Sequence, residues 1–149
     1  MRGWLAWIGF AALAVGCGGS YDASVSGSVT LDGAPLPRGT IKFNPLAEGP
    51  ASYGLVGNDG SYAIQTGREP GLPSGDYAVT IVANEPSVEQ DPGSGLPPRP
   101  GKPITPPWYR SAESSPLKQR VEPGKNRIDL QLTTQPPPGW NPRGGRRSR

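Results

Sequence analysis

The stretch Val25-Ser-Gly-Ser-Val-Thr-Leu-Asp-Gly-Ala-Pro-Leu-Pro37 decides the fold class. From Val25 to Leu31 every second residue is apolar or glycine, and the residues between them are serine or threonine. This alternation predicts a strand with one buried face, because successive side chains of a strand point to opposite sides. Asp32 and Gly33 then supply residues that are typical of a turn.

The same combination of a short alternating segment and a turn recurs along the chain. Six further segments are expected to be strands: Thr40–Pro45, Ala51–Val56, Tyr62–Ile64, Tyr77–Ala83, Leu117–Val121 and Ile128–Leu132. Seven strands without a convincing helix predict an all-β protein, a seven-stranded Greek-key sandwich of the immunoglobulin-like kind. We expect the most apolar segment, Tyr77–Ala83, at the centre of a sheet.

Two local features sharpen this expectation. Tyr53 and Leu55 fall on one face of their segment. Asn58, Asp59 and Gly60 follow, and these residue types can take the positive φ values that a tight hairpin demands.

Residues 84–116 interrupt the alternation with nine prolines, and an unusually long connection is expected there. Its only aromatic residues are Trp108 and Tyr109. Aromatic side chains on a proline-stiffened loop can bind a sugar or a peptide. The alternative, which we favour, is that both rings fold down and cover the open end of the core.

Composition removes many function classes. The chain has no histidine and a single cysteine, Cys17. Ser-His-Asp catalysis, histidine-ligated zinc and an internal disulfide are therefore excluded. The acids Glu85, Glu89 and Asp91 lie in the proline-rich connection, where no cleft for paired carboxylates is expected. Asn58 and Asp59 could meet Asp32 or Asp76 at a calcium ion, but the hairpin already explains them. We expect no enzyme, no catalytic residue, no metal and no cofactor.

Charge is divided unevenly along the chain. The formal net charge is +3, yet residues 17–133 carry ten Lys and Arg against twelve Asp and Glu. The excess lies in residues 133–149, an Arg- and Pro-rich stretch that we expect to be a disordered basic tail, with no means of packing from Gln135 onward. This distribution gives no reason to expect a nucleic-acid partner. The tail either lies on an anionic surface or is simply solvated.

The N-terminal residues 1–16 have the pattern of a signal peptide, with Arg2 before an apolar run that is too short to span a bilayer. Leu13-Ala-Val-Gly-Cys17 resembles the lipobox of bacterial lipoproteins, although Ala14 stands where Leu, Val or Ile is usual. The resemblance implies cleavage before Cys17 and attachment of lipid, such as palmitate, to its thiol. Residues 17–23 would then form a flexible tether. The alternatives are an ordinary cleaved signal or an uncleaved anchor.

Residues 24–132 resemble the carboxypeptidase regulatory-like domain, a transthyretin-like sandwich found in short bacterial lipoproteins. The motifs that carry the resemblance are Val25-x-Gly27-x-Val29-Thr30-x-x-Gly33-x-Pro35-Leu36, Ile41-x-Phe43-x-Pro45, Asp59-Gly60-x-Tyr62, Pro73-x-Gly75-x-Tyr77-x-Val79, Trp108-Tyr109 ahead of Ser115-Pro-Leu117, and Val121-x-Pro123-Gly124-x-Asn126. The resemblance implies a fold and a cell-envelope location, and it implies no activity.

The function that these features predict is structural or interaction-based. We expect a non-catalytic sandwich held extracytoplasmically by membrane lipid on Cys17. The absence of Asp after Cys17 favours the outer membrane or cell surface, by resemblance to lipoprotein sorting. The alternative is a binding module that takes an envelope glycan or a protein partner through the loop around Trp108 and Tyr109.

Overall fold

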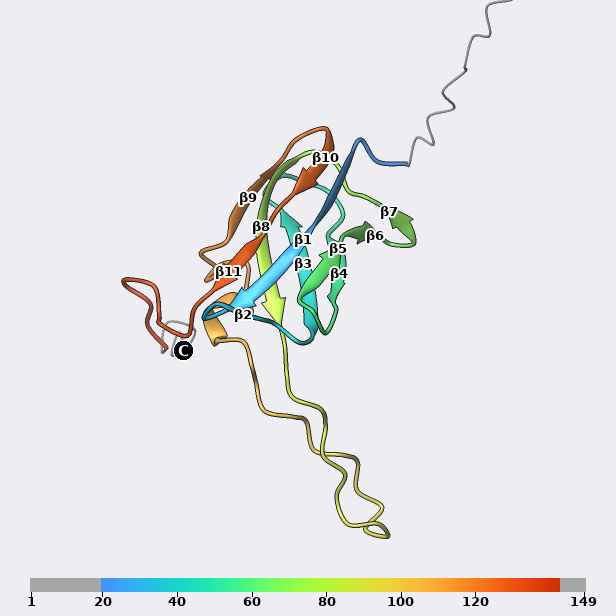
Figure 1. The fold of residues 1–149 in the computed structure, drawn as a ribbon, viewed down its shortest axis with the longest axis vertical. Coiled ribbons are helices and arrows are strands. Elements are labelled where there is room, and N and C mark those ends of the chain that lie inside the picture. Colours follow the sequence, from blue (N-terminus) through green and yellow to red (C-terminus); the bar gives the residue numbers. More distant parts are fainter. Residues whose placement is uncertain (1–19, 143–149) are drawn as a thin grey trace, which may run out of the picture.

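The protein is a β-sandwich, in which a five-stranded sheet packs against a six-stranded sheet (Figure 1). The computed structural model describes residues 20–142. The strands are β1 (Ala23–Leu31), β2 (Ala34–Pro35), β3 (Gly39–Pro45), β4 (Ser52–Val56), β5 (Ser61–Ala63), β6 (Gln65–Thr66), β7 (Glu69–Pro70), β8 (Gly75–Val82), β9 (Lys118–Val121), β10 (Gly124–Arg127) and β11 (Leu130–Leu132). Within this part of the chain the only helical element is a 3-10 turn, η1 (Pro107–Tyr109). The predicted all-β class and sandwich are confirmed.

Strand β1 is the centre of the first sheet. Its burial alternates from Ala23 to Val29 as predicted, with Val25 and Val29 in the core, and Leu31 at its end is only partly buried. It pairs in parallel with β10 over its first half and with β11 over its second half, and antiparallel with β2 and β5. Gly27 lies where β10 gives way to β11, and a Cβ there would be 2.0 Å from the carbonyl oxygen of Ile128. The close approach of these two backbones therefore requires glycine at position 27.

The second sheet has the order β7-β6-β4-β3-β8-β9. Strand β8 pairs antiparallel with both β3 and β9, so the most apolar segment is an interior strand as expected, although β4 and β3 are the middle pair. Tyr77, Val79 and Ile81 of β8 point into the core. Burial on both faces of β8 suits its continuous apolar sequence.

The strand count differs from the expected seven because the chain forms several very short strands. Strands β2, β6 and β7 have two residues each, and β10 forms between the last two expected segments. These short elements are set by pairing with a neighbour and leave no alternating pattern to detect. The Greek-key connectivity stays a prediction.

The turn at Asn58, Asp59 and Gly60 exists but is built differently from the expected hairpin. Only Gly60 has positive φ, at 82°. The carboxylate of Asp59 closes the turn by accepting from the amide and hydroxyl of Ser61, at 3.0 and 2.6 Å. The strands on either side belong to different sheets, because β4 pairs with β3 and β5 pairs with β1. The turn thus carries the chain across the sandwich.

Tyr53 and Leu55 share a face, and that face is exposed. The inward positions of β4 are Ser52, Gly54 and Val56. A Cβ at Gly54 would lie 2.6 Å from the carbonyl oxygen of Ala63, so the close approach of β5 admits only glycine there. Strand β4 therefore turns its larger side chains outward.

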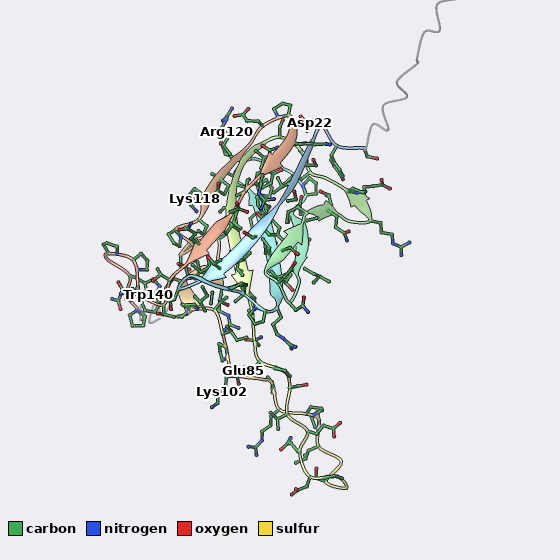
Figure 2. All side chains as sticks on the ribbon, viewed as in Figure 1. Asp22, Glu85, Lys102, Lys118, Arg120 and Trp140 are labelled. Atoms are coloured by element: carbon green, nitrogen blue, oxygen red, sulfur yellow. The ribbon has the colours of Figure 1, made fainter. Side chains whose placement is uncertain are left out.

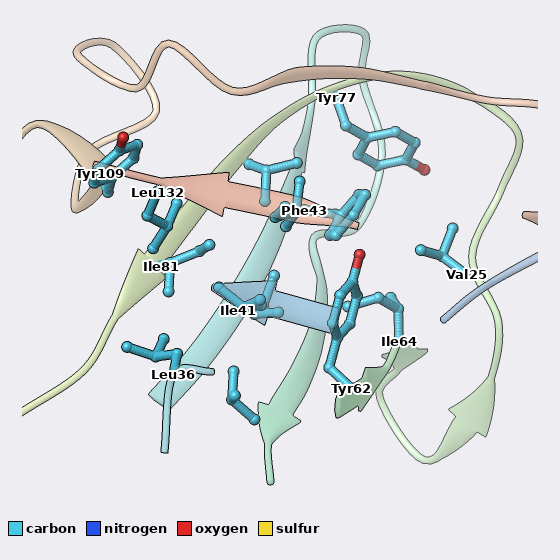
Figure 3. Packing of buried hydrophobic residues seen from close by; sticks show 14 of the residues in the cluster. Val25, Leu36, Ile41, Phe43, Tyr62, Ile64, Tyr77, Ile81, Tyr109 and Leu132 are labelled. Atoms are coloured by element: carbon cyan, nitrogen blue, oxygen red, sulfur yellow. The ribbon is translucent and has the colours of Figure 1, made fainter. Parts of the chain in front are cut away.

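The core lies between the two sheets and contains side chains from both (Figure 3). Phe43 and Tyr77 meet edge to face, with ring centroids 5.7 Å apart. The hydroxyl of Tyr62 donates to the carbonyl of Ile128 at 2.6 Å, and that of Tyr77 donates to Pro73 at 2.7 Å. Burial raises the pKa of both phenols. Each buried hydroxyl thus has the acceptor that it requires.

Candidate functional site

The sandwich has two distinct ends, which we call proximal and distal. At the proximal end β1 and β8 begin, and the carboxylate of Asp22 accepts from the amide and hydroxyl of Ser74 at 2.8 and 2.6 Å. At the distal end the same strands finish, at Leu31 and Val82. Nine residues of β1 place these ends about 30 Å apart. Asp22 and Trp140 mark the proximal and distal ends in Figure 2.

Trp108 and Tyr109 lie at the distal end, inside the hydrophobic core. Their exposed fractions are 6% and 2%. The turn η1, which begins with Pro107, directs both rings inward, and the hydroxyl of Tyr109 accepts from the amide of Thr133 at 3.0 Å. These are the positions expected of rings that cover the open end of the core. The other interpretation is that these two rings bind a ligand directly. Little of their surface is accessible for such binding.

The segment 133–142, expected to be unable to pack, instead contacts the distal end. The amide and hydroxyl of Thr134 donate to the carboxylate of Asp32 at 3.1 and 2.8 Å. Trp140 meets Trp108 edge to face, with ring centroids 5.0 Å apart. The reason is the large apolar area of Trp140, which a composition-based interpretation of the tail overlooks. The sequence feature that could have predicted this packing is the tryptophan within the proline-rich stretch.

Trp108 also carries an unusual polar atom. Among residues 20–142, its indole Nε1 is the only buried side-chain nitrogen or oxygen without a hydrogen-bond partner. Burying an N–H group without a hydrogen-bond acceptor costs free energy. Packing of the Trp108 ring against the core and Trp140 must therefore hold it in this position.

An open groove of about 690 Å³ lies between the loop 107–116 and the segment 137–142. We call it the distal groove. Trp140 contributes its one aromatic side chain and Glu113 its one charged side chain, and prolines form much of both walls. A binding site in the loop around Trp108 was the alternative interpretation of the sequence, and the groove adjoins that loop. The aromatic residue that it offers to a ligand is Trp140, with Trp108 behind it.

Residues 84–103 leave the distal end as a narrow projecting arm (Figure 1). Across its base the amide of Glu85 donates to the carbonyl of Lys102 at 2.8 Å, and both residues are labelled in Figure 2. Further out, Val88 and Arg99 exchange two backbone hydrogen bonds of 3.0 and 2.9 Å. Residues 84–103 of the long connection therefore form an arm with two limbs. The rest of the connection, up to residue 116, lies against the sandwich.

The carboxylates nearest the strands have structural partners. Asp22, Asp32, Asp59 and Asp129 each accept from the backbone amide and the hydroxyl of one serine or threonine, and these bonds lower the pKa of all four. Asp76 pairs with Arg120 at 3.2 Å. Residues 20–142 contain no group of three or more His, Cys, Asp or Glu that could hold a metal ion. The acids considered for calcium bind separate partners and do not converge.

Cys17 and the lipobox lie outside the described residues, as do the arginines of residues 143–149. No helix in residues 20–142 is long and apolar enough to cross a membrane. The sandwich begins at Ala23, six positions after Cys17. No family model, curated protein or solved structure matches the chain.

Proposed function

We propose that the chain is a non-catalytic cell-envelope protein, held at a membrane by lipid on Cys17, whose sandwich presents a binding surface away from that membrane. The observation that carries the proposal is the position of the only cysteine, at the end of the apolar N-terminal run and six positions before β1. Six residues reach at most about 20 Å. A lipid on Cys17 would thus hold the proximal end near the bilayer.

The polarity of the sandwich supports this arrangement. The chain enters β1 at the proximal end, beside Asp22, whereas the arm and the distal groove lie at the other end. An anchored molecule would therefore carry both features about 30 Å further from the bilayer than its tether. This separation suits a role in contacting other envelope components.

The carboxylates near the strands support a non-catalytic role. Four of them each accept hydrogen bonds from one serine or threonine. Hydrogen bonds from these donors stabilise the ionised carboxylates, so these groups are poor general acids near neutral pH. Their positions at strand ends and turns serve the fold.

A second function is favoured by the distal groove: a binding module for an envelope glycan or a peptide. The groove combines an aromatic side chain, a carboxylate and two serines, which is a lining that either kind of ligand can use. Titration of tryptophan fluorescence with envelope glycan fragments and with peptides separates the two ligands. A Trp140→Phe variant identifies the responding ring.

The anchor is tested by metabolic labelling with palmitate in a bacterial host, followed by intact-mass and peptide mapping of the membrane fraction. The proposal predicts a mature N-terminus at acylated Cys17. Cys17→Ser should remove the label, and Ala14→Leu, which restores the usual lipobox residue, should keep or increase it. Unmodified Cys17 in both the native chain and the Ala14→Leu variant would contradict the anchor.

A further inference from the structure

We infer that the distal groove of one copy binds the returning limb of the arm of a second copy, over Leu96-Pro-Pro-Arg-Pro100. This inference rests on the proposed use of the groove as a binding site and names its ligand as an extended, proline-rich, basic peptide. The two partners would associate head to tail, since the limb and the groove are different surfaces.

The limb is held open and extended by its sequence. Proline fixes its own φ and drives the preceding residue toward an extended conformation, so Leu96 to Pro100 have few alternatives. All five residues are exposed, and Leu96 is 61% exposed. In a polyproline helix, with three residues per turn, Pro97 and Pro100 lie on one edge, about 9 Å apart.

Contacts across the arm hold the limb in place before any partner arrives. Arg99 is paired through its backbone with Val88, and its side chain donates to the amide oxygen of Gln90 at 3.1 Å. The side chain of Gln90 donates in turn to the carbonyl of Pro97 at 2.6 Å. Such ordering lowers the entropy lost on binding.

The charges of the arm are separated by limb. The outgoing limb carries Glu85, Glu89 and Asp91, whereas the returning limb carries Arg99 and Lys102. Within residues 20–142, neither Arg99 nor Glu113 of the groove takes part in an ion pair. Arg99 donates to Gln90 through Nε, so its terminal guanidinium nitrogens could add a charge-assisted bond to Glu113 while that contact is kept.

The groove has the chemistry that proline-rich segments require. Such segments bind to grooves lined by aromatic side chains, against which the proline rings pack. Trp140 supplies the aromatic surface and Glu113 an acid for the arginine. The base of the arm is closed by the bond between Glu85 and Lys102 and by that from Ile104 to Ala83, which keeps the limb away from its own groove. A second copy is thus the occupant that fits.

Anchoring would favour the same contact. The arm projects from the distal end and the groove lies at that end (Figure 1), so both would face away from the membrane that holds the anchor. Confinement to a membrane also raises the effective concentration of copies for one another.

The test is sedimentation of the full chain, recovered from membranes in detergent micelles, over a range of protein concentrations. We expect reversible association that is weakened about tenfold or more by Arg99→Glu and by Glu113→Arg, each a reversal of one charge. The double variant should regain association, because the charges are again complementary. Glu89→Arg, on the outgoing limb, is the matched control and should leave association unchanged.

Trp140→Ala should also weaken association. The double variant Pro97→Ala, Pro100→Ala should weaken it as well, although it changes no residue of the groove. A chain that stays monomeric at every concentration would overturn the inference, as would association that ignores both charge reversals. Binding of glycan fragments in the groove with no self-association would overturn it as well. Acylation of Cys17 is measured separately, so failure of the anchor and failure of the arm contact are distinguishable.

Discussion

Two proline-rich segments of this chain behave in opposite ways. The arm, residues 84–103, projects from the sandwich, whereas the segment 133–142 packs against it. Both are rich in proline and both lack a strand pattern. The segment that packs contains Trp140, and the arm has no aromatic residue. Proline content therefore does not decide whether such a segment packs here, and a single large apolar side chain does.

The loop between Ile104 and Pro116 supports the same conclusion. It continues directly from the arm and contains three more prolines, yet Trp108 and Tyr109 bring it back to the core. The arm's own apolar side chains, Val88 and Leu96, are 66% and 61% exposed. Each is too small and too isolated to bring its limb to the sandwich.

The largest expected effect comes from removing the aromatic residue that closes the core. Trp108→Ala should lower the free energy of unfolding by about 3–5 kcal/mol, because it leaves a cavity at the distal end. The matched change on the arm, Leu96→Ala, should alter it by less than about 0.5 kcal/mol. Urea denaturation followed by circular dichroism measures both. Equal losses for the two variants would remove the distinction between the segments.

A smaller effect is expected from Trp140→Ala. Loss of its contact with Trp108 should cost about 1–3 kcal/mol and release the segment 133–142 from the sandwich. Limited proteolysis should then cut within 135–142 faster than in the native chain, while cleavage of the arm should be unchanged. Unaltered cleavage of that segment would show that Trp140 does not hold it.

The contact between Asp32 and Thr134 gives a pH-dependent effect. Hydrogen bonds from Thr134 hold the pKa of Asp32 below its ordinary value of 3.8, and Asp22, Asp59 and Asp129 are lowered in the same way. A folded-state pKa below the unfolded value stabilises the fold above about pH 4, and the gain is lost as the pH falls through the folded-state values. Stability should therefore decrease on acidification below about pH 4.

Asp32→Asn isolates one of these groups. Asparagine tolerates the φ of 49° at this position, so the backbone conformation is retained. The variant should lose less stability than the native chain between pH 7 and pH 3, as measured by the urea midpoint. An identical pH dependence would mean that Asp32 contributes nothing as a carboxylate.

The smallest effect is expected from removing the arm. Replacing residues 85–102 by a short Gly-Ser turn should change the free energy of unfolding by less than about 1 kcal/mol, because the arm buries little and shorter loops close at less entropic cost. Thermal denaturation measures this. A large destabilisation would show that the arm belongs to the folded core.

The alternating pattern was enough to predict the sandwich and the inward residues of β1, but not the pairing. Val25 and Val29 report which face of their strand is buried, because burial follows the two-residue repeat. The same repeat does not identify neighbours, so the parallel pairing of β1 with β10 and β11 leaves no local trace. The crossing from β4 to β5 depends on backbone approach at Gly54 and Gly60, which only the assembled structure reveals.

The candidate site could be predicted in part. The loop around Trp108 was identified, since it holds the only aromatic pair of the long connection. Its partner Trp140 lies 32 positions away in a segment whose proline and arginine content predicted disorder. Long-range contact between two isolated side chains has no periodicity, so the groove between them could not be inferred from either stretch alone.

Packing of residues 133–142 over Trp108 is the claim on which the groove and its ligand depend. Hydrogen exchange of backbone amides tests it most directly. We predict protection at Thr133, Thr134 and Trp140, whose amides donate to Tyr109, Asp32 and Pro137 respectively, together with rapid exchange at the arm tip near Gly93. Exchange at these three amides as fast as at the arm tip would contradict the account.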